Sequence, residues 1–274
     1  GPLRMNGTLA WKWSHPGGQG THVIGGPLID GSFSLYVAAV DGVRKFNRDG
    51  RLLWTYQSTT ALSGCPSLMG DRLYGNDENG QVFALNLETG DPVWSKRFAS
   101  SVGRDAACVQ SHNGIVVTGV ESTSDGSGNT RMLGINGSTG DLIWSHNLST
   151  PVRNVMALFE DTKGASTTLF MDVHGGVHRR RLEDGRVVWY NPAAGSEHSY
   201  SEGGLTLGRD GSTYACSNPG LSTGLEGQKG ILRKYDHHKG ALLWEARLPY
   251  PCNSWPAVSE DSKYVVVASG PVSE

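Results

Sequence analysis

The hydrophobic residues of this chain lie in short runs separated by turn residues, and one arrangement of such runs recurs along the sequence. In residues 80–94, an apolar run is followed by Glu-Thr-Gly and by a second run that ends in tryptophan. Short apolar runs bounded by Gly, Asn and Asp are typical of strands. No stretch shows the periodicity of an amphipathic helix. The pattern predicts an all-β chain built by repeating one unit.

Six tryptophans mark the ends of the repeated units. Each follows a turn glycine by four positions, as Trp94 follows Gly90. The spacing of about 40 to 55 residues between them is typical of four-stranded propeller blades. The six are Trp11, Trp54, Trp94, Trp144, Trp189 and Trp244.

Each interval supplies two more strand-like runs before the recurring unit. In the second interval these are residues 66–68 and 72–75, and in the fifth they are residues 204–207 and 212–216. Asp-Gly and Asn-Gly dipeptides between such runs indicate hairpins, because both residues tolerate positive φ. The 38 glycines of the chain fit frequent turns of this kind. Each blade is therefore predicted to have four antiparallel strands.

The two ends of the chain each resemble half a blade. Residues 253–258 and 262–268 follow Trp244 as two strands, and residues 2–5 and 8–13 precede the first complete unit as two more. The pattern predicts a six-bladed β-propeller of four-stranded antiparallel blades, with the last blade closed by N- and C-terminal strands, in a single domain over residues 1–274. Such closure removes exposed strand edges. A fragment of a longer array is the alternative.

The Thr-Gly-x-x-x-Trp ending at Trp94 and Trp144, with looser forms at Trp189 and Trp244, resembles the quinoprotein-like, or PQQ-like, β-propeller repeat. The resemblance covers nearly the whole chain. It implies that each tryptophan lies on an outermost strand and docks between blades, which is a structural role. It also implies a secreted or periplasmic location. Non-enzymatic members use the same repeats to bind other proteins, so the resemblance implies a protein or peptide partner.

The resemblance does not extend to a quinone cofactor. Quinone-dependent dehydrogenases of this family are longer, eight-bladed chains with an adjacent cysteine pair, a catalytic aspartate and a calcium site. This chain has no adjacent cysteines, and we expect no cofactor. Its net charge of −2 provides no basic footprint for nucleic acid. No apolar run is long enough to be a membrane span.

Polar side chains where each innermost strand begins are the candidates for ligand binding. In a propeller, the loops entering these strands meet at one face, here called the loop face, around the mouth of the central channel. Arginines beside His, Tyr and Asn can bind a carboxylate, phosphate or sulfate group. A polar entrance to a water-filled channel is the alternative interpretation. The candidates, called the channel-mouth ring, are His22, Leu62 or Ser63, Arg104, Asp105, Arg153, Asn154, Tyr200 with Ser201, and Asn253.

Two long loops are predicted on the same face, between the second and third strands of their blades. Residues 121–130 and 217–230 are rich in Gly and Ser, and such loops can close over a ligand or partner. Residues 220–224 match the Gly-x-Ser-x-Gly pattern of a nucleophile elbow. That motif needs a strand-to-helix turn, so we interpret the match as chance.

The histidines predict no metal site. His174 and His178 flank Gly175-Gly176, interpreted as a two-residue hairpin turn that places the imidazoles on opposite faces of the sheet. His237 and His238 fall in a turn that is predicted to be solvated.

The cysteines are too few and too scattered for a disulfide scaffold. Cys65 and Cys108 fall at equivalent places in the innermost strands of adjacent blades, where strands are expected to diverge too far for a relaxed bridge. Free, buried thiols are therefore predicted for Cys65 and Cys108, and Cys216 and Cys252 complete the set of four.

Two classes of function follow from the sequence. The first is a non-catalytic binding propeller that takes a protein or peptide, or a small anionic or polar molecule, through its loop face and channel mouth. The alternative is a small enzyme of hydrolase, lyase or cyclase type, whose active site is formed by polar residues around the central channel. The sequence alone leaves open whether the chain is catalytic.

Overall fold

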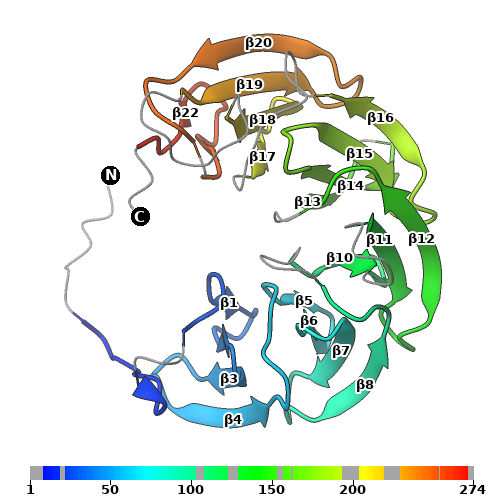
Figure 1. Ribbon diagram of the computed structural model, residues 1–274. Helices are drawn as coiled ribbons and strands as arrows, with labels where there is room; N and C mark the ends of the chain where they lie inside the picture. Colours follow the sequence, from blue (N-terminus) through cyan, green and yellow to red (C-terminus); the bar gives the residue numbers. More distant parts are fainter. Residues whose placement is uncertain are drawn as a thin grey trace.

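A computed structural model describes residues 9–18, 22–102, 108–122, 129–152, 157–161, 163–192, 204–218, 229–252 and 254–270. In this part of the chain every regular element of more than one turn is a β-strand, as predicted. No helix among these residues is long and apolar enough to cross a membrane. Five four-stranded antiparallel sheets and one two-stranded sheet follow one another around a common centre (Figure 1).

The strands follow chain order within every sheet, with the first strand innermost and the fourth outermost (Figure 1). Blade 1 contains β1 (Leu28–Ile29), β2 (Leu35–Ala39), β3 (Gly42–Phe46) and β4 (Leu52–Gln57), and blade 2 contains β5 (Ser67–Met69), β6 (Arg72–Asn76), β7 (Gln81–Asn86) and β8 (Pro92–Arg97). Blade 3 contains β9 (Gln110–His112), β10 (Ile115–Ser122), β11 (Asn129–Asn136) and β12 (Leu142–Leu148), and blade 4 contains β13 (Ala157–Glu160), β14 (Ser166–Met171), β15 (Val177–Arg181) and β16 (Val187–Asn191). Blade 5 contains β17 (Leu205–Leu207), β18 (Ser212–Ser217), β19 (Ile231–Asp236) and β20 (Leu242–Arg247), and the last sheet contains β21 (Ala257–Val258) and β22 (Val265–Val266).

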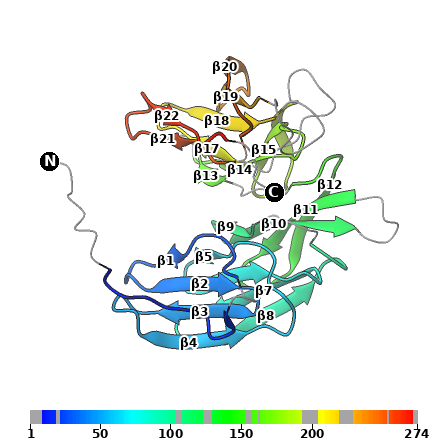
Figure 2. The same ribbon diagram turned by 60° about the vertical axis from the view of Figure 1, so that its left-hand side comes forward.

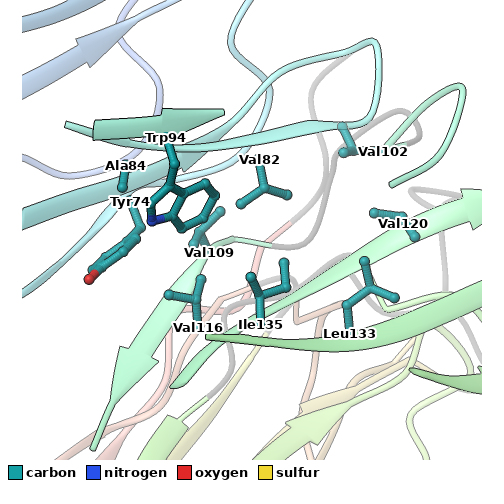
Figure 3. Packing of buried hydrophobic residues seen from close by; sticks show 10 residues of the cluster. All are labelled: Tyr74, Val82, Ala84, Trp94, Val102, Val109, Val116, Val120, Leu133 and Ile135. Atoms are coloured by element: carbon teal, nitrogen blue, oxygen red, sulfur yellow. The ribbon is translucent and has the colours of Figure 1, made fainter. Parts of the chain in front are cut away.

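The hydrophobic core lies between blades rather than within one. Figure 3 shows Tyr74, Ala84 and Trp94 of blade 2 packed toward Val109 and Val116 of blade 3. Burial of these apolar surfaces stabilises the stacking of one blade on the next. A blade therefore needs a neighbour, which is why the repeat builds an array.

Each of Trp11, Trp54, Trp94, Trp144 and Trp189 docks on the blade that follows it in the chain. Its indole covers the turn glycine between the third and fourth strands of the next blade, and its Nε1 donates to a backbone carbonyl near that turn. Five such hydrogen bonds are formed, Trp11 to Arg48 at 3.2 Å, Trp54 to Leu87 at 3.1 Å, Trp94 to Gly137 at 2.9 Å, Trp144 to Leu182 at 2.8 Å and Trp189 to His237 at 2.9 Å. Their predicted structural role is confirmed.

Glycine is required at each of these turns for two reasons, the backbone conformation and the closeness of the indole. Gly140, for example, has a φ of 74°, and a β-carbon there would collide with the indole of Trp94. Only glycine adopts that backbone conformation freely while allowing an aromatic ring so close. Each glycine of the repeated unit therefore contacts the tryptophan of the preceding unit, and each tryptophan contacts the glycine of the following one.

The prediction of six blades and a closed ring is not confirmed. Among the described residues, β21 and β22 pair only with each other, and residues 9–13 form no strand. The other predicted N-terminal strand, residues 2–5, lies outside the described residues. Residues 9–18, called the N-terminal segment, and β22 lie at opposite ends of the arc of sheets (Figure 2).

Two of the four cysteines are bonded, although their small number and scattered positions predicted no disulfide scaffold. Cys216 of β18 and Cys252, which precedes β21, form a disulfide with their Cα atoms 6.0 Å apart. The bridge covalently joins blade 5 to the two-stranded sheet. Cys65 and Cys108 are free, as predicted.

Candidate functional site

Of the charged or aromatic members of the predicted channel-mouth ring, His22 lies among the described residues. His22 is exposed, and its carbonyl accepts a hydrogen bond from Val40 at 3.2 Å. Leu62 belongs to the buried core and Ser63 is half-buried. The remaining members lie outside the described residues, namely Arg104, Asp105, Arg153, Asn154, Tyr200, Ser201 and Asn253.

The two predicted long loops lie largely outside the described residues as well. β10 continues to Ser122 and β11 begins at Asn129, so the first of these connections is shorter than its composition predicted. In the second, Ser217 ends β18 and Asn218 is buried, where its side-chain oxygen accepts a hydrogen bond from the Cys252 backbone at 2.7 Å.

The N-terminal segment docks on blade 1 through alternate residues. Trp11, Trp13 and His15 are partly buried, while the residues between them are exposed. Trp11 lies over Phe46 with ring centroids 5.9 Å apart, and Trp13 meets the same ring at 5.4 Å. Alternation of this kind is typical of an extended strand with one face buried. The segment therefore occupies the position that the outermost strand of a preceding blade takes elsewhere in the array.

A charged cluster fixes the end of this segment at the loop face. Asp41, in the turn between β2 and β3, accepts hydrogen bonds from Arg44 at 2.9 and 2.7 Å. His15 Nε2 lies 3.1 Å from both of its carboxylate oxygens, and Arg44 lies over the Trp13 ring at 5.4 Å. The Arg44 hydrogen bonds, aided by His15, hold the pKa of Asp41 well below its usual range. Sequence reasoning missed this cluster, because no local motif joins residues 15 and 41.

Apolar side chains are exposed at the other end of the arc. Trp244 is 38% exposed, whereas its counterparts Trp94 and Trp144 are 9% and 7% exposed. Tyr264 and Val266, at the two-stranded sheet, are 71% and 68% exposed. Trp244 contacts Tyr214 of its own blade, with ring centroids 6.1 Å apart. These three residues, Trp244, Tyr264 and Val266, form what we call the seam surface, where a following blade would pack.

The connection between β14 and β15, which contains His174 and precedes His178, differs from its prediction. Met171 pairs with Val177, so the connection is a five-residue loop and not a two-residue turn at Gly175-Gly176. The Asp172 carboxylate explains the longer loop, because it accepts hydrogen bonds from the backbone of His174 at 3.0 Å and Gly176 at 2.9 Å. No group of three or more metal-ligating side chains is found in the described residues.

His178 is enclosed by the same loop. Its Nε2 lies 2.8 Å from Asp172 Oδ2, and its ring stacks on Phe170 at 4.7 Å and lies 4.3 Å from Tyr190. Burial raises the pKa of Tyr190, and the Asp172 charge adds to this shift. The arrangement is a structural network beneath the loop face.

His237 is buried, which corrects the prediction of a solvated pair. Its ring is 6% exposed, lies against Phe159 at 4.4 Å and has Nδ1 3.3 Å from Thr213 Oγ1. Burial, with the nearby charge of Arg179, lowers its pKa to about 4. The neighbouring His238 is exposed. Docking of Trp189 on the His237 carbonyl draws this turn into the interface between blades 4 and 5.

The buried His237 predicts a loss of stability in mild acid. Its folded pKa of about 4 lies below the unfolded value of 6.5, so the unfolded chain binds the additional proton between these values. Protonation of His237 in the unfolded chain should therefore lower the free energy of unfolding by roughly 2–3 kcal/mol as the pH drops from 6.5 to 4. Urea titrations at several pH values will measure this change in the free energy of unfolding. His237→Gln should flatten this dependence, and the exposed His238→Gln should not; equal slopes for all three proteins would contradict the assignment.

The fold and its tryptophan–glycine contacts define a β-propeller of PQQ-like repeats. A family model described as outer membrane protein assembly factor BamB matches residues 37–229, and the chain belongs to this family. BamB of Aliivibrio fischeri (strain ATCC 700601 / ES114) is 36% identical over 64 residues, which cover 19% of this chain and 17% of that protein. The match thus spans less than one fifth of the curated relative.

Solved structures share the fold at low sequence identity. BamB from Moraxella catarrhalis aligns with a TM-score of 0.50 at 14% identity, covering 88% of this chain and 83% of that one. A europium-containing methanol dehydrogenase aligns at 0.54 and 12% identity, covering 91% and 75%. The quinohemoprotein alcohol dehydrogenase ADHIIG from Pseudomonas putida HK5 aligns at 0.55 and 14% identity, covering 88% and 44%. At these identities the likeness concerns the fold alone.

Proposed function

We propose that this chain is a non-catalytic propeller that binds a protein or peptide at its loop face. The observation that carries the proposal is the family match over residues 37–229. The description of that family names the assembly of outer membrane proteins, and an assembly factor must contact the chains it assembles. No feature of the described residues favours the hydrolase, lyase or cyclase alternative.

The channel-mouth ring is the binding surface in this proposal. Its two arginines, Arg104 and Arg153, can pair with carboxylates or donate to peptide carbonyls, and His22 is exposed beside them in the predicted ring. Tyr250 adds an exposed aromatic side chain on a loop entering an innermost strand, with 52% of its surface accessible. Arginine and tyrosine are enriched at protein interfaces. Asp105, Asn154, Tyr200 and Asn253 complete the proposed set.

A peptide titration tests the proposed function. The probe is a synthetic peptide of about ten alternating apolar and polar residues, the pattern of outer-membrane barrel strands, and its scrambled sequence is the control. Fluorescence anisotropy should show saturable binding of the alternating peptide. The triple variant His22→Ala, Arg104→Ala, Arg153→Ala should bind at least about tenfold more weakly with an unchanged thermal midpoint. Equal binding by the triple variant, or binding of the scrambled peptide alone, would contradict the proposal.

We further propose that the ring closes as one six-bladed domain through the N-terminal segment. This segment already lies on blade 1 in the position of an outermost strand, and Trp244 is docked on no turn within the part of the chain that the structure describes. Gly7 precedes Trp11 by four positions, as the docked turn glycines precede their tryptophans. The proposal therefore pairs Trp244 with that turn and β22 with the strands beside it.

Replacing Trp244 tests closure. In a closed ring Trp244→Ala should lower the free energy of unfolding by about 3–5 kcal/mol, because a docked indole and its hydrogen bond are lost. Chemical denaturation of the variant beside Trp189→Ala, which removes a docked tryptophan, provides the comparison. A loss below about 1 kcal/mol, as for a surface residue, would show that the ring stays open.

A further inference from the structure

The innermost strands of blades 2 and 3 approach each other closely at the loop face. The Val109 backbone N–H donates to the Cys65 carbonyl across 2.9 Å. Two residues farther along each chain, Ser67 Oγ donates to Ser111 Oγ at 2.9 Å. Neighbouring innermost strands were expected to diverge here, and these two bonds show that they do not.

Cys65 and Cys108 lie at this close approach. Cys65 is the residue that accepts the backbone hydrogen bond, and Cys108 immediately precedes the residue that donates it. Each thiol is the largest influence on the pKa of the other. Cys65 is half-buried and Cys108 is buried. Gly25 of the chain entering blade 1 packs directly on the Cys65 sulfur.

The two thiols differ in acidity. Interaction with Cys108 lowers the pKa of Cys65 to about 7, so Cys65 is deprotonated more readily than an ordinary thiol. The same interaction and burial raise the pKa of Cys108. A more exposed, acidic thiol beside a buried partner is the arrangement of an attacking and a resolving cysteine.

We propose that Cys65 and Cys108 form a dithiol that exchanges with small-molecule disulfides and closes into a bond between blades 2 and 3. The Cys65 thiolate attacks one sulfur of the reagent, whose S–S bond breaks and releases one thiolate. Cys108 loses its proton to solvent and attacks the Cys65 sulfur, displacing the second thiolate. Two protein thiols are oxidised, and one reagent disulfide is reduced to two thiols.

The product would be a second disulfide between neighbouring blades, in addition to the Cys216–Cys252 bond that the chain already contains. The Cys216–Cys252 disulfide joins blade 5 to the segment that enters the next innermost strand. A Cys65–Cys108 bond would join two such entering segments on the other side of the channel. The redox state of the pair therefore sets how firmly blades 2 and 3 are held together at the channel mouth.

Incubation of the full chain with oxidised glutathione at neutral pH tests the proposal. Thiol titration in denaturant should fall from two free thiols to none, and intact-mass spectrometry should show loss of two hydrogens with no retained glutathione. Cys108→Ser should stop at a stable mixed disulfide with one glutathione on Cys65. Cys65→Ser should react at least about tenfold more slowly, because its remaining thiol is buried.

The wild-type protein alone can overturn the proposal. Retention of glutathione at the end of its reaction, or survival of both thiols, would show that the pair does not close. Equal reaction rates for Cys65→Ser and Cys108→Ser would remove the assigned order of attack. Circular dichroism melting of both variants before oxidation shows whether they are folded, and the wild-type masses decide the matter if one is not.

Discussion

Replacing Trp144 with alanine is expected to lower the free energy of unfolding by about 3–5 kcal/mol. The indole is 7% exposed and packs with Met132, Phe170 and Leu182 in a core shared by blades 3 and 4. Its Nε1 donates to the Leu182 carbonyl at 2.8 Å. Alanine would leave a cavity between blades 3 and 4. It would also leave the buried Leu182 carbonyl without its hydrogen bond from the indole. Urea denaturation followed by circular dichroism measures the loss.

The neighbouring Ile143 provides the matched control. It lies on the same strand, is 45% exposed, and stands at the register shift between Gly134 and Ile135, where it has no partner on β11. Ile143→Ala should cost less than about 1 kcal/mol. Similar losses for the two variants would show that the indole does not hold blades 3 and 4 together.

Removing the Cys216–Cys252 disulfide is also expected to lower the stability of the fold by several kcal/mol. The bridge spans 36 residues of sequence, and a loop of that length predicts a stabilisation of about 3–4 kcal/mol from the restricted unfolded chain. Both side chains are fully buried, so the double variant Cys216→Ala, Cys252→Ala also loses some packing. Its thermal midpoint should lie clearly below that of the wild type.

Reductant separates the bond from the packing. Dithiothreitol should lower the thermal midpoint of the wild-type protein toward that of the double variant and leave the variant itself unchanged. A wild-type midpoint that does not move under full reduction, verified by thiol titration, would contradict a stabilising role for this bridge.

The repeat and its strands are determined by the sequence alone. The four-residue spacing between Gly140 and Trp144 indicates a hairpin and an outer strand within one short segment. The same local spacing at five other tryptophans predicts the blades and their order. Local spacing suffices because hairpin pairing joins residues that are close along the chain. The strand pairs of blades 1 to 5 therefore follow from the pattern, and the docking role of the tryptophans follows from the family resemblance.

The contacts between distant segments were decided by the tertiary structure. The Cys216–Cys252 bridge, the approach of Cys65 to Cys108 and the burial of His237 each depend on how one blade is placed against the next. No local pattern records that placement, because the residues involved are tens of positions apart. At the loop face, the hydrogen bonds from backbone N–H groups to Asp172 set a longer turn than glycine content predicts. The repeated positions thus specify the blades, and packing between blades specifies the chemistry of the positions that are not repeated.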